Sequence, residues 1–584
     1  MQYTMCGIWL YLVKQGCSPS VSTTDMFNSF NKLKKRGPNY SQFLDLSQYG
    51  LYIGFHRLSI MDVSVRGNQP FVIENENNIT YLICNGEIYN FRELESKYNI
   101  KTQSFSDCEV ILYLYKIVGF DKMIKELDGE FAFCLIDIDK KTNKVTIKVG
   151  RDHCGIRPIF ITGTSEEILL TSEMKGSPFL HKNYNIYQFP PRHYMTVSNF
   201  DDILFSLNLN DFQQWKNNVS YYDTFYKNSN KFTQWIDFKN VSTKITEEKE
   251  ALEKIKETLI KSVRDRMVAN RPIGCLLSGG LDSSLVSSIA SKYCKEHGTK
   301  LKTFSIGLIG GSTDEYYAKM VSKHINSEHT HVYVSEEECL ETLNKITYIT
   351  ETFDITTTRA SVFEYLIAKY ISEHTDIKVL LVGEGSDECY SGYMYFHNAP
   401  SSEESHKENI RLIEDIHLYD GLRADRCVSH CGLEVRVPFL SKECVMLSLS
   451  LHPESKRQIN GMEKYILRKA FHTSNYLPEK VLWRTKEAQS DGCSSMNRSW
   501  YQIIQEYISM NESKNECITD YIKPITSEGI YYRCNFQKYF YDTDTNAKVI
   551  PYIWMPKWTH GANDPSARTL NIYKNKMQKT DEKI

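Results

Sequence analysis

Ser278-Gly279-Gly280-Leu281-Asp282-Ser283-Ser284 is the stretch that decides the fold of the C-terminal half of this chain. It follows a predicted strand at residues 273–277 and precedes a predicted helix at 285–293. A Gly-Gly turn leading into a helix presents backbone N–H groups and serine hydroxyls to an anion, and the helix dipole adds to the attraction. The Walker spacing GxxxxGK[ST] and its lysine are absent. A purely structural turn is the alternative, which the serines and the aspartate disfavour, so we predict a phosphate-binding loop.

The segments around this loop alternate between strand and helix. Strand-length apolar runs occur at residues 272–277, 302–307, 331–334 and 378–383, with helix-length stretches between them. Just before the first run, apolar residues recur at three- and four-residue spacing, which predicts a helix with one buried face: Leu252, Ile255, Leu259, Val263 and Met267. The alternation predicts an α/β doubly wound parallel sheet with extra helices.

A second polar loop, Gly383-Glu384-Gly385-Ser386-Asp387-Glu388, follows the predicted strand at 378–382. It lies at the carboxyl end of that strand, where open α/β sheets bind their ligands. The glycines beside Glu384 and Asp387 permit close approach to a ligand, and Asp282 beside bound phosphates is a candidate to hold Mg²⁺. For Glu388 a solvated acidic turn remains an equal alternative.

The first 200 residues have a different pattern. Short apolar or alternating runs at 51–90 and 127–172 predict antiparallel strands, and residues 108–118 predict a helix between them. We therefore predict an α+β domain over residues 6–204. Residues 205–244 are rich in Asn, Lys, Tyr, Phe and Gln without a sustained period, which predicts an insertion or linker before a second domain at 245–584.

The bulk composition limits the class of protein. A chain of 584 residues is too long for one core and fits two large domains. A net charge of −2 gives no electrostatic footprint for nucleic acid or an anionic membrane. The 16 cysteines show no CxxC pairs, and neither a signal peptide nor a membrane span is evident. We therefore expect a soluble, cytoplasmic protein with reduced thiols.

The C-terminal motifs carry a resemblance to known enzymes. Residues 278–284 resemble the pyrophosphate-binding loop of the N-type ATP pyrophosphatases, and residues 383–388 match the GEGSDE motif of the asparagine synthetase family. Further matches to that family include Glu351-Thr-Phe-Asp, Leu422-Arg-Ala-Asp-Arg, Glu434-Val-Arg-Val-Pro, Gly461-Met-Glu-Lys and the tail segment Trp554-Met-Pro-Lys. The resemblance therefore spans almost the whole C-terminal half.

The N-terminal motifs resemble a class II glutamine amidotransferase domain. They occur in the family's order: Cys6-Gly-Ile-Trp, His56-Arg-Leu-Ser-Ile, Asn85-Gly-Glu-Ile-Tyr-Asn, Ser106-Asp-Cys-Glu and Gly150-Arg-Asp. Taken alone, Cys6 would be read as a buried strand residue. One departure is Arg192, which stands where the family usually has Gly. The resemblance implies an N-terminal-nucleophile glutaminase with an αββα sandwich.

That resemblance has a consequence for the start of the functional chain. N-terminal-nucleophile enzymes use the free α-amine of the first residue, with a pKa of about 7.7–8.0, as the base for its own thiol. Met5-Cys6 has the form of an initiator followed by a small nucleophile. We therefore expect the functional chain to begin at Cys6, through initiation at Met5 or through trimming.

The resemblance also implies the reaction and its residues. Glutamine would be hydrolysed through a Cys6 thioester, and the ammonia would displace AMP from a β-aspartyl-AMP made from aspartate and Mg-ATP. Asn85 and Gly86 would form the oxyanion hole, and Glu384 would take a proton. Asp387 would help to hold Mg²⁺, and Lys464 would neutralise phosphate charge. The glutamine-binding set would be Arg57, Leu58, Ser59, Ile60, Met61, Asn85, Gly86, Glu87 and Asp107.

The implied nucleotide site draws on three strand ends. Its residues would be Leu277, Ser278, Gly279, Gly280, Asp282, Ser283, Ile306, Val382 and Gly383, with Arg359 and Lys464 for aspartate or pyrophosphate. Arg426 and Arg436 could equally form structural ion pairs. Arg151 and Asp152 are expected to form a structural pair rather than to act in catalysis. The family also implies a homodimer.

Three alternatives stay open. One is an amidotransferase-fused synthetase of the β-lactam synthetase type, which acts on another carboxylate. Another is a non-catalytic binding protein, whose expected signature would be lost phosphate-loop or carboxylate residues. The third is a synthetase that uses only free ammonia.

Overall fold

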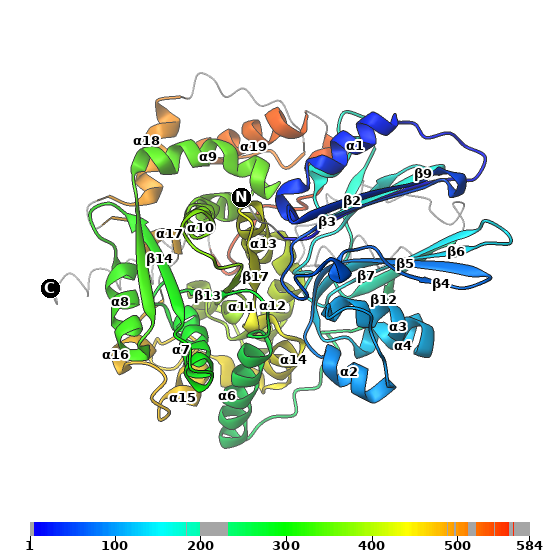
Figure 1. Ribbon diagram of the computed structural model, residues 1–584. Coiled ribbons are helices and arrows are strands. Elements are labelled where there is room, and N and C mark those ends of the chain that lie inside the picture. Colours follow the sequence, from blue (N-terminus) through cyan, green and yellow to red (C-terminus); the bar gives the residue numbers. More distant parts are fainter. Residues whose placement is uncertain are drawn as a thin grey trace.

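Two domains lie side by side in the computed structural model (Figure 1). It describes residues 5–182, 184–198, 232–486, 489–495, 498–511, 521–541, 544–559 and 564–565. The N-terminal domain contains two antiparallel sheets, and the C-terminal domain contains one parallel sheet surrounded by helices. The predicted two-domain layout and both fold classes are confirmed.

The N-terminal domain is built on two six-stranded antiparallel sheets. The first has the order β10 (Ile186–Gln188), β8 (Phe160–Gly163), β9 (Glu167–Thr171), β1 (Gly7–Val13), β3 (Leu51–Arg57) and β2 (Tyr40–Leu46). The second has the order β12 (Thr233–Gln234), β11 (His193–Val197), β7 (Val145–Arg151), β6 (Gly129–Asp139), β5 (Asn78–Ile88) and β4 (Phe71–Glu74).

Period-two alternation explains how these sheets form layers. In β1, Ile8 and Leu10 face the second sheet and pack with Ile83 and Ile136, whereas Trp9 faces the other way. Helix α1 (Thr23–Asn31) covers that outer face, and α2 (Phe91–Tyr98), α3 (Val110–Val118) and α4 (Phe120–Glu126) cover the outer face of the second sheet. This is the expected αββα sandwich, with the predicted 108–118 helix present as α3.

The C-terminal domain has a five-stranded, entirely parallel sheet. Its order is β15 (Glu328–Val334), β14 (Lys302–Leu308), β13 (Ile273–Leu276), β16 (Val379–Leu381) and β17 (Glu434–Arg436). The chain adds strands to one side of β13 and then to the other, so β13 marks the switch point of the sheet. The four predicted strands are present, and β17 is a fifth that hydropathy did not reveal.

Helices precede the sheet and connect its strands. The longer ones are α6 (Glu248–Asp265), α7 (Leu281–Glu296), α8 (Thr313–Ile325), α9 (Glu336–Thr350), α10 (Ile355–His374), α12 (Ser402–Asp415), α13 (Asp420–His430), α14 (Lys442–Ser450), α18 (Trp500–Ser509) and α19 (Ser527–Phe540). The shorter ones are α11 (Ser386–Cys389), α15 (Tyr465–Phe471), α16 (Glu479–Leu482), α17 (Gln489–Gly492) and α20 (Asp544–Ala547). In α6 the predicted stripe is buried at Ile255, Leu259 and Val263.

The segment predicted as a linker is partly outside the described residues. Residues 205–231 are not described, but β12 at Thr233–Gln234 pairs with β11 of the N-terminal sheet. The chain after residue 231 therefore first adds an edge strand to the N-terminal domain and then reaches α6.

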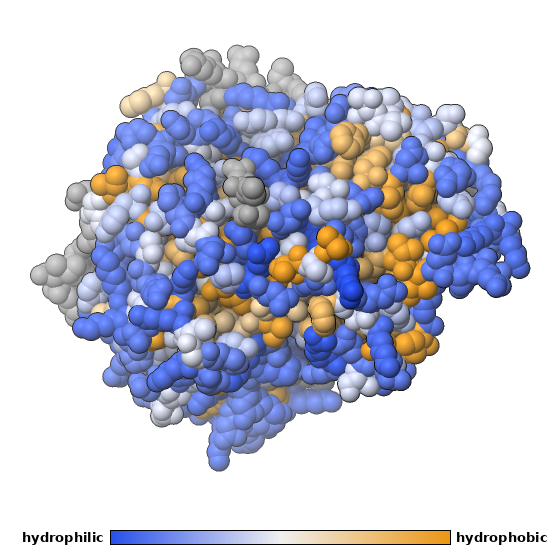
Figure 2. Space-filling model, in the orientation of Figure 1, coloured by the Kyte–Doolittle hydropathy of each residue, from blue (hydrophilic) through white to orange (hydrophobic). Residues whose placement is uncertain are grey.

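Hydrophilic residues dominate the face shown in Figure 2, and apolar residues form small patches between them. None of the described helices combines the length and the apolar character needed to cross a membrane. One buried apolar cluster continues from Leu58, Ile60 and Ile156 of the first domain into the core of the second, so the domains share an apolar interface.

Candidate active sites

A cavity of about 320 Å³ opens at the carboxyl ends of β13, β14 and β16. Because β13 is the switch point, this is the crevice where open α/β sheets bind ligands. Every residue of the predicted nucleotide set lines it except Gly279. Gly279 has φ +76°, and a Cβ there would lie 2.5 Å from the backbone nitrogen of Ala318, so this glycine lets the loop pack against α8.

The loop between β13 and α7 has the geometry of an anion site. The Ser278 and Ser283 hydroxyls lie 3.0 Å apart, and the Gly280 N–H points to Ser278 Oγ at 3.3 Å. Gly280 caps α7 without a side-chain hydrogen bond, so the first N–H groups of this 16-residue helix remain open to a ligand. A Cβ at Gly383 would lie 2.7 Å from Ser283 N, so the two polar loops touch there.

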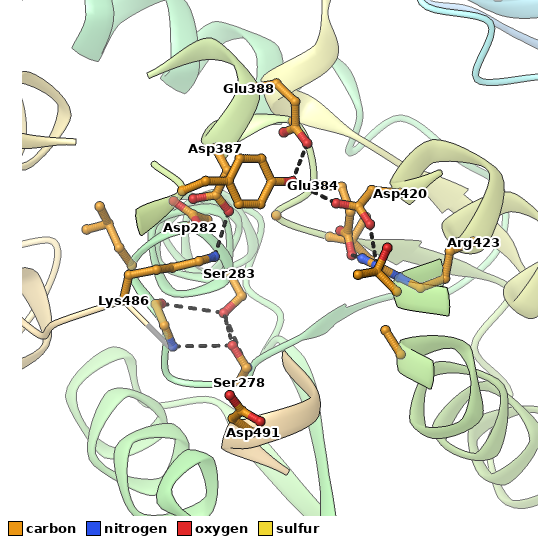
Figure 3. Close-up of a pocket in the computed structure, with 18 of the residues that line it drawn as sticks. Ser278, Asp282, Ser283, Glu384, Asp387, Glu388, Asp420, Arg423, Lys486 and Asp491 are labelled. Atoms are coloured by element: carbon orange, nitrogen blue, oxygen red, sulfur yellow. Dashed lines mark hydrogen bonds and ion pairs between the residues drawn. The ribbon is translucent and has the colours of Figure 1, made fainter. Parts of the chain in front are cut away.

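Two lysines hold the carboxylates of these loops together. Lys464 Nζ donates to Asp282 Oδ2 at 2.6 Å and to Asp387 Oδ1 at 2.8 Å. Lys486 Nζ donates to Asp387 Oδ2 at 2.6 Å (Figure 3). Burial opposes ionisation of Asp387, but both lysine charges outweigh it and hold the pKa of that carboxyl well below its usual range. Asp282 Oδ1 is buried and has no hydrogen-bond partner among the described residues.

Glu384 faces a different group of charges. Its Oε1 lies 3.3 Å from Arg423 Nη2, and Arg423 also binds Glu364 at 2.6 Å and Asp420. Burial raises the pKa of Glu384, although Arg423 opposes the shift. A partly exposed carboxyl with a raised pKa is suited to accept a proton near neutral pH.

Arg359 lines the cavity but is already paired. Its guanidinium donates to both oxygens of Glu528, at 2.8 and 3.1 Å, and to Asp564 at 3.1 Å. A contact of Arg359 with aspartate or pyrophosphate therefore requires one of these ion pairs to open.

The thiol of Cys6 lies at the start of β1 in the N-terminal domain. Its Sγ is 3.4 Å from Leu58 N and 3.7 Å from Leu58 O, and burial raises the pKa of the Cys6 thiol to about 12. The side chain of the preceding Met5 is 1% exposed and contacts Arg157, with 3.1 Å between Met5 Sδ and Nη1. No thiolate forms near neutral pH in this environment without a base.

Asn85 and Gly86 lie on β5. Both side-chain atoms of Asn85, Nδ2 and Oδ1, are buried without a partner among the described residues. Such an amide is costly unless a ligand binds it. Gly86 cannot carry a Cβ, since that atom would lie 2.1 Å from Glu130 O. An open amide donor at this point is what an oxyanion hole requires.

Arg57, another predicted glutamine contact, binds a neighbouring loop of the protein itself. Arg57 does not fork toward an open site, because its terminal nitrogens donate to Ser64 O and Asn68 Oδ1, both at 2.7 Å, and to Met61 O at 3.2 Å. It therefore shapes the loop that contains Ser59, Ile60 and Met61. Three hydrogen bonds tie this loop to the second domain: Asn270 N to Ile60 O at 3.1 Å, Asp62 N to Asn270 Oδ1 at 3.0 Å and Arg271 Nε to Ser59 O at 3.1 Å.

Asp107 and Glu87 lie in a buried acidic region beside β5. Asp107 Oδ2 accepts the Ile88 N–H at 2.6 Å, and burial raises the pKa of Asp107 to about 6. Burial, together with the charge of Asp107, also raises the pKa of Glu87. Glu87 pairs at 3.2 Å with Arg436 of the second domain.

Arg436, Arg426 and Arg151 are each engaged in ion pairs or hydrogen bonds within the protein. Arg436 pairs with Glu434 at 2.8 Å, and Arg426 pairs with Asp425 at 2.8 Å. Arg151 donates to the carbonyls of Arg157 and Gly155. Asp152 accepts backbone N–H groups of Cys154, Ile156 and Arg157. Arg151 and Asp152 thus order the backbone.

Arg192 occupies a glycine-like conformation. Its φ is +65°, its side chain is fully buried, and Nη2 lies 3.7 Å from Glu414 of the second domain. The left-handed backbone explains why the family usually has Gly at this position. The ion pair with Glu414 gives the arginine a role at the domain interface.

Several cavity residues escaped the sequence analysis. The main ones are Tyr393, Arg411, Asp415, Asp420, Arg423 and Lys486. Arg423 lies inside the matched motif at 422–426, Asp420 lies two residues before that motif, and Tyr393 lies five residues after the 383–388 loop. Arg411, Asp415 and Lys486 come from segments far from both loops.

Comparisons with known proteins agree with this geometry. The family model for asparagine synthase matches residues 254–414 and 398–545, and that for a glutamine amidotransferase domain matches 5–199. Asparagine synthetase [glutamine-hydrolyzing] of Gallus gallus is 37% identical over 98% of this chain and 100% of its own. The Homo sapiens protein of that name shows the same values, and the Rattus norvegicus one is 38% identical over 98% and 99%. The chain belongs to the glutamine-hydrolysing asparagine synthetases.

Proposed function

We propose that this enzyme makes asparagine through β-aspartyl-AMP and releases AMP, pyrophosphate and glutamate. The observation that carries the proposal is the junction of the phosphate loop with Asp282, Asp387, Lys464 and Lys486 in one cavity. A β-carboxylate that attacks the α-phosphorus expels pyrophosphate, and this loop and these lysines can bind the departing charge.

The donor set in the cavity fits Mg²⁺. The described residues contain no cluster of three or more His, Cys, Asp or Glu side chains, but Mg²⁺ with a nucleotide needs only one or two carboxylates beside the phosphates. Asp282 Oδ1, buried and without a partner among the described residues, and Asp387 are the groups that would hold it. When bound, the ion supplies charge neutralisation to the phosphates.

Each protein group then has a defined task. Ser278, Gly280 and Ser283 hold the β- and γ-phosphates, and Lys464 and Lys486 pass from the carboxylates to the phosphates. Glu384 takes the proton released when ammonia attacks the activated carbonyl. The aspartyl carbon–oxygen bond breaks, and the oxygen leaves with AMP.

In the first domain, we propose that Cys6 attacks the glutamine amide once its own α-amine is free. Asn85 and Gly86 stabilise the oxyanion, Asp107 and Glu87 bind the glutamine α-ammonium group, and the loop held by Arg57 borders the carboxylate. Met5 blocks this mechanism, because it converts the amine of Cys6 to an amide. The fifteen described cysteines are free thiols, which supports a reducing cytoplasmic location, and a homodimer remains a proposal from the family.

Oxygen transfer tests the intermediate directly. Aspartate labelled with ¹⁸O in the β-carboxylate is incubated with the enzyme, Mg-ATP and ammonia. The proposal predicts one ¹⁸O atom in the AMP phosphate and none in pyrophosphate. Appearance of the label in orthophosphate together with ADP would show that a β-aspartyl phosphate forms instead.

A further inference from the structure

One wall of the synthetase cavity is acidic and lies across the cavity from the phosphate loop. Figure 3 shows Glu388 and Asp420 on the far side of the view from Ser278. The wall also includes Asp415 at the end of α12. Glu388 is 4% exposed and Asp415 is 2% exposed, so water cannot solvate these carboxylates freely.

A single hydroxyl serves two of these carboxylates. Tyr393 Oη lies 2.6 Å from Glu388 Oε1 and 2.9 Å from Asp420 Oδ2. A tyrosine hydroxyl has one hydrogen to donate, so it can satisfy only one of the two acceptors at a time. The arrangement is one donor short.

Asp415 gives an independent indication of a missing donor. Its Oδ2 accepts the Tyr552 hydroxyl at 2.5 Å and lies 3.7 Å from Arg411 Nη1. Its Oδ1 is buried and has no hydrogen-bond partner among the described residues. A buried acceptor without a donor costs stability unless a ligand binds it.

The cations near this wall are already committed. Arg423 serves Glu364, Asp420 and Glu384. Arg411 forks onto both oxygens of Glu408, at 2.6 and 2.8 Å. Within the described part of the chain, Glu388 has the tyrosine hydroxyl but no ion-pair partner. Among the described residues, Glu388 therefore lacks a counter-charge and Asp415 Oδ1 lacks a donor.

We propose that Glu388, Asp415 and Asp420 form the subsite for the α-ammonium group of the amino-acid substrate. A primary ammonium group brings one positive charge and three N–H donors, which are what Glu388 and Asp415 lack within the described residues. Its position across from the phosphate loop lets the β-carboxylate of the same molecule point toward the α-phosphate. The inference rests on the proposed function, and it assigns Glu388 to binding, where the sequence left a solvated turn equally open.

Removal of the amino group from the substrate isolates the contact. Affinities for aspartate and for succinate, which lacks the α-amino group, are measured with Mg-ATP present in the wild type, Glu388→Gln and Asp415→Asn. The wild type should prefer aspartate, and each variant should lose about 30-fold in aspartate affinity while binding succinate unchanged. Ser305→Ala, on the nucleotide side of the cavity, should keep the wild-type ratio.

Two results would overturn the assignment of this wall to the α-ammonium group. One is an equal loss of affinity for aspartate and succinate in both variants. The other is a raised KM for ammonium with aspartate affinity unchanged, which would show that the wall binds the ammonium ion. A thermal melt of each variant identifies loss of folding. Because Glu388 and Asp415 are changed separately, the test still holds if one of the two variants does not fold. If the wild type forms no pyrophosphate with aspartate, the proposed function fails first.

Discussion

Lys486 Nζ lies 2.6 Å from Asp387 Oδ2 and shares that carboxylate with a second lysine, Lys464, on its other oxygen. One negative charge thus serves two positive ones. Lys464 also binds Asp282, so two carboxylates and two ammonium groups alternate in a chain of ion pairs. When a cation and a triphosphate enter, the carboxylates can turn to the cation and the lysines to the phosphates.

Replacement of Lys486 by Met should lower kcat for aspartate-dependent pyrophosphate release by about 10²–10³-fold, because one preorganised positive charge on the phosphates is lost. The assay measures pyrophosphate with saturating ammonia. Glutamine hydrolysis by the same variant should be unchanged, since Lys486 lies in the other domain. An equal loss of both activities would instead indicate general misfolding.

Replacement of Asn85 by Ala should lower glutamine-dependent asparagine formation by about 10²–10³-fold, because the amide is the open donor at the predicted oxyanion hole. Asparagine is measured with glutamine and, separately, with ammonia as the nitrogen source. Ammonia-dependent synthesis should be preserved. A fall of the same size with ammonia would contradict the role of Asn85 in the glutaminase step.

The pH dependence of glutamine use should report Asp107. Burial raises the pKa of Asp107 to about 6, so the carboxylate that pairs with the glutamine α-ammonium group is protonated below that pH. We expect kcat/KM for glutamine to fall as pH drops through about 6, mainly through a higher KM. In Asp107→Asn, kcat/KM for glutamine should be lower at every pH and should no longer fall as the pH drops through about 6. If the fall below about pH 6 persists in Asp107→Asn, another group is responsible for it.

Replacement of Arg36 by Met should destabilise the domain interface. Arg36 is buried and pairs with Glu173 at 2.8 Å and with Asp425 of the second domain at 2.9 Å. Lys175 still pairs with Glu173, and Arg426 still pairs with Asp425. The variant therefore loses the Arg36 hydrogen bonds without leaving a bare charge, at a cost of about 1.5–3 kcal/mol in the free energy of unfolding.

Urea unfolding of Arg36→Met measures this cost. The matched control is Lys254→Met, which breaks the half-exposed pair with Glu250 on α6 and should cost less than about 0.5 kcal/mol. Equal shifts in the two variants would show that the buried pair contributes no more than a surface pair.

The sequence predicted those features that depend on local pattern. The loop at 278–284 combines a strand, a glycine turn and a helix within a few residues, so its position at the switch of the sheet follows from connection rules alone. Strand β17 was missed because Glu434, Val435 and Arg436 are too short a run to show a period, and its place comes from pairing with β16.

The side chains that complete the sites could not be predicted, because they meet through long-range packing. Lys486 reaches Asp387 from 99 residues away, and Asp415 joins the cavity through the corner between α12 and α13. Arg57 was predicted to face the substrate, but the fold of the 61–68 loop turns its guanidinium onto carbonyl groups. The sequence alone does not show that backbone carbonyl groups compete with a ligand for the N–H donors of Arg57.

Transfer of the glutamine amide nitrogen is the most direct test of the central claim. Protein that begins at Cys6 is incubated with aspartate, Mg-ATP and amide-¹⁵N glutamine, beside a Cys6→Ala variant fed with glutamine or with ammonia. The account predicts ¹⁵N in the asparagine side chain with equal amounts of AMP and pyrophosphate, lost in Cys6→Ala and restored by ammonia. Absence of AMP with aspartate under either nitrogen source would contradict it.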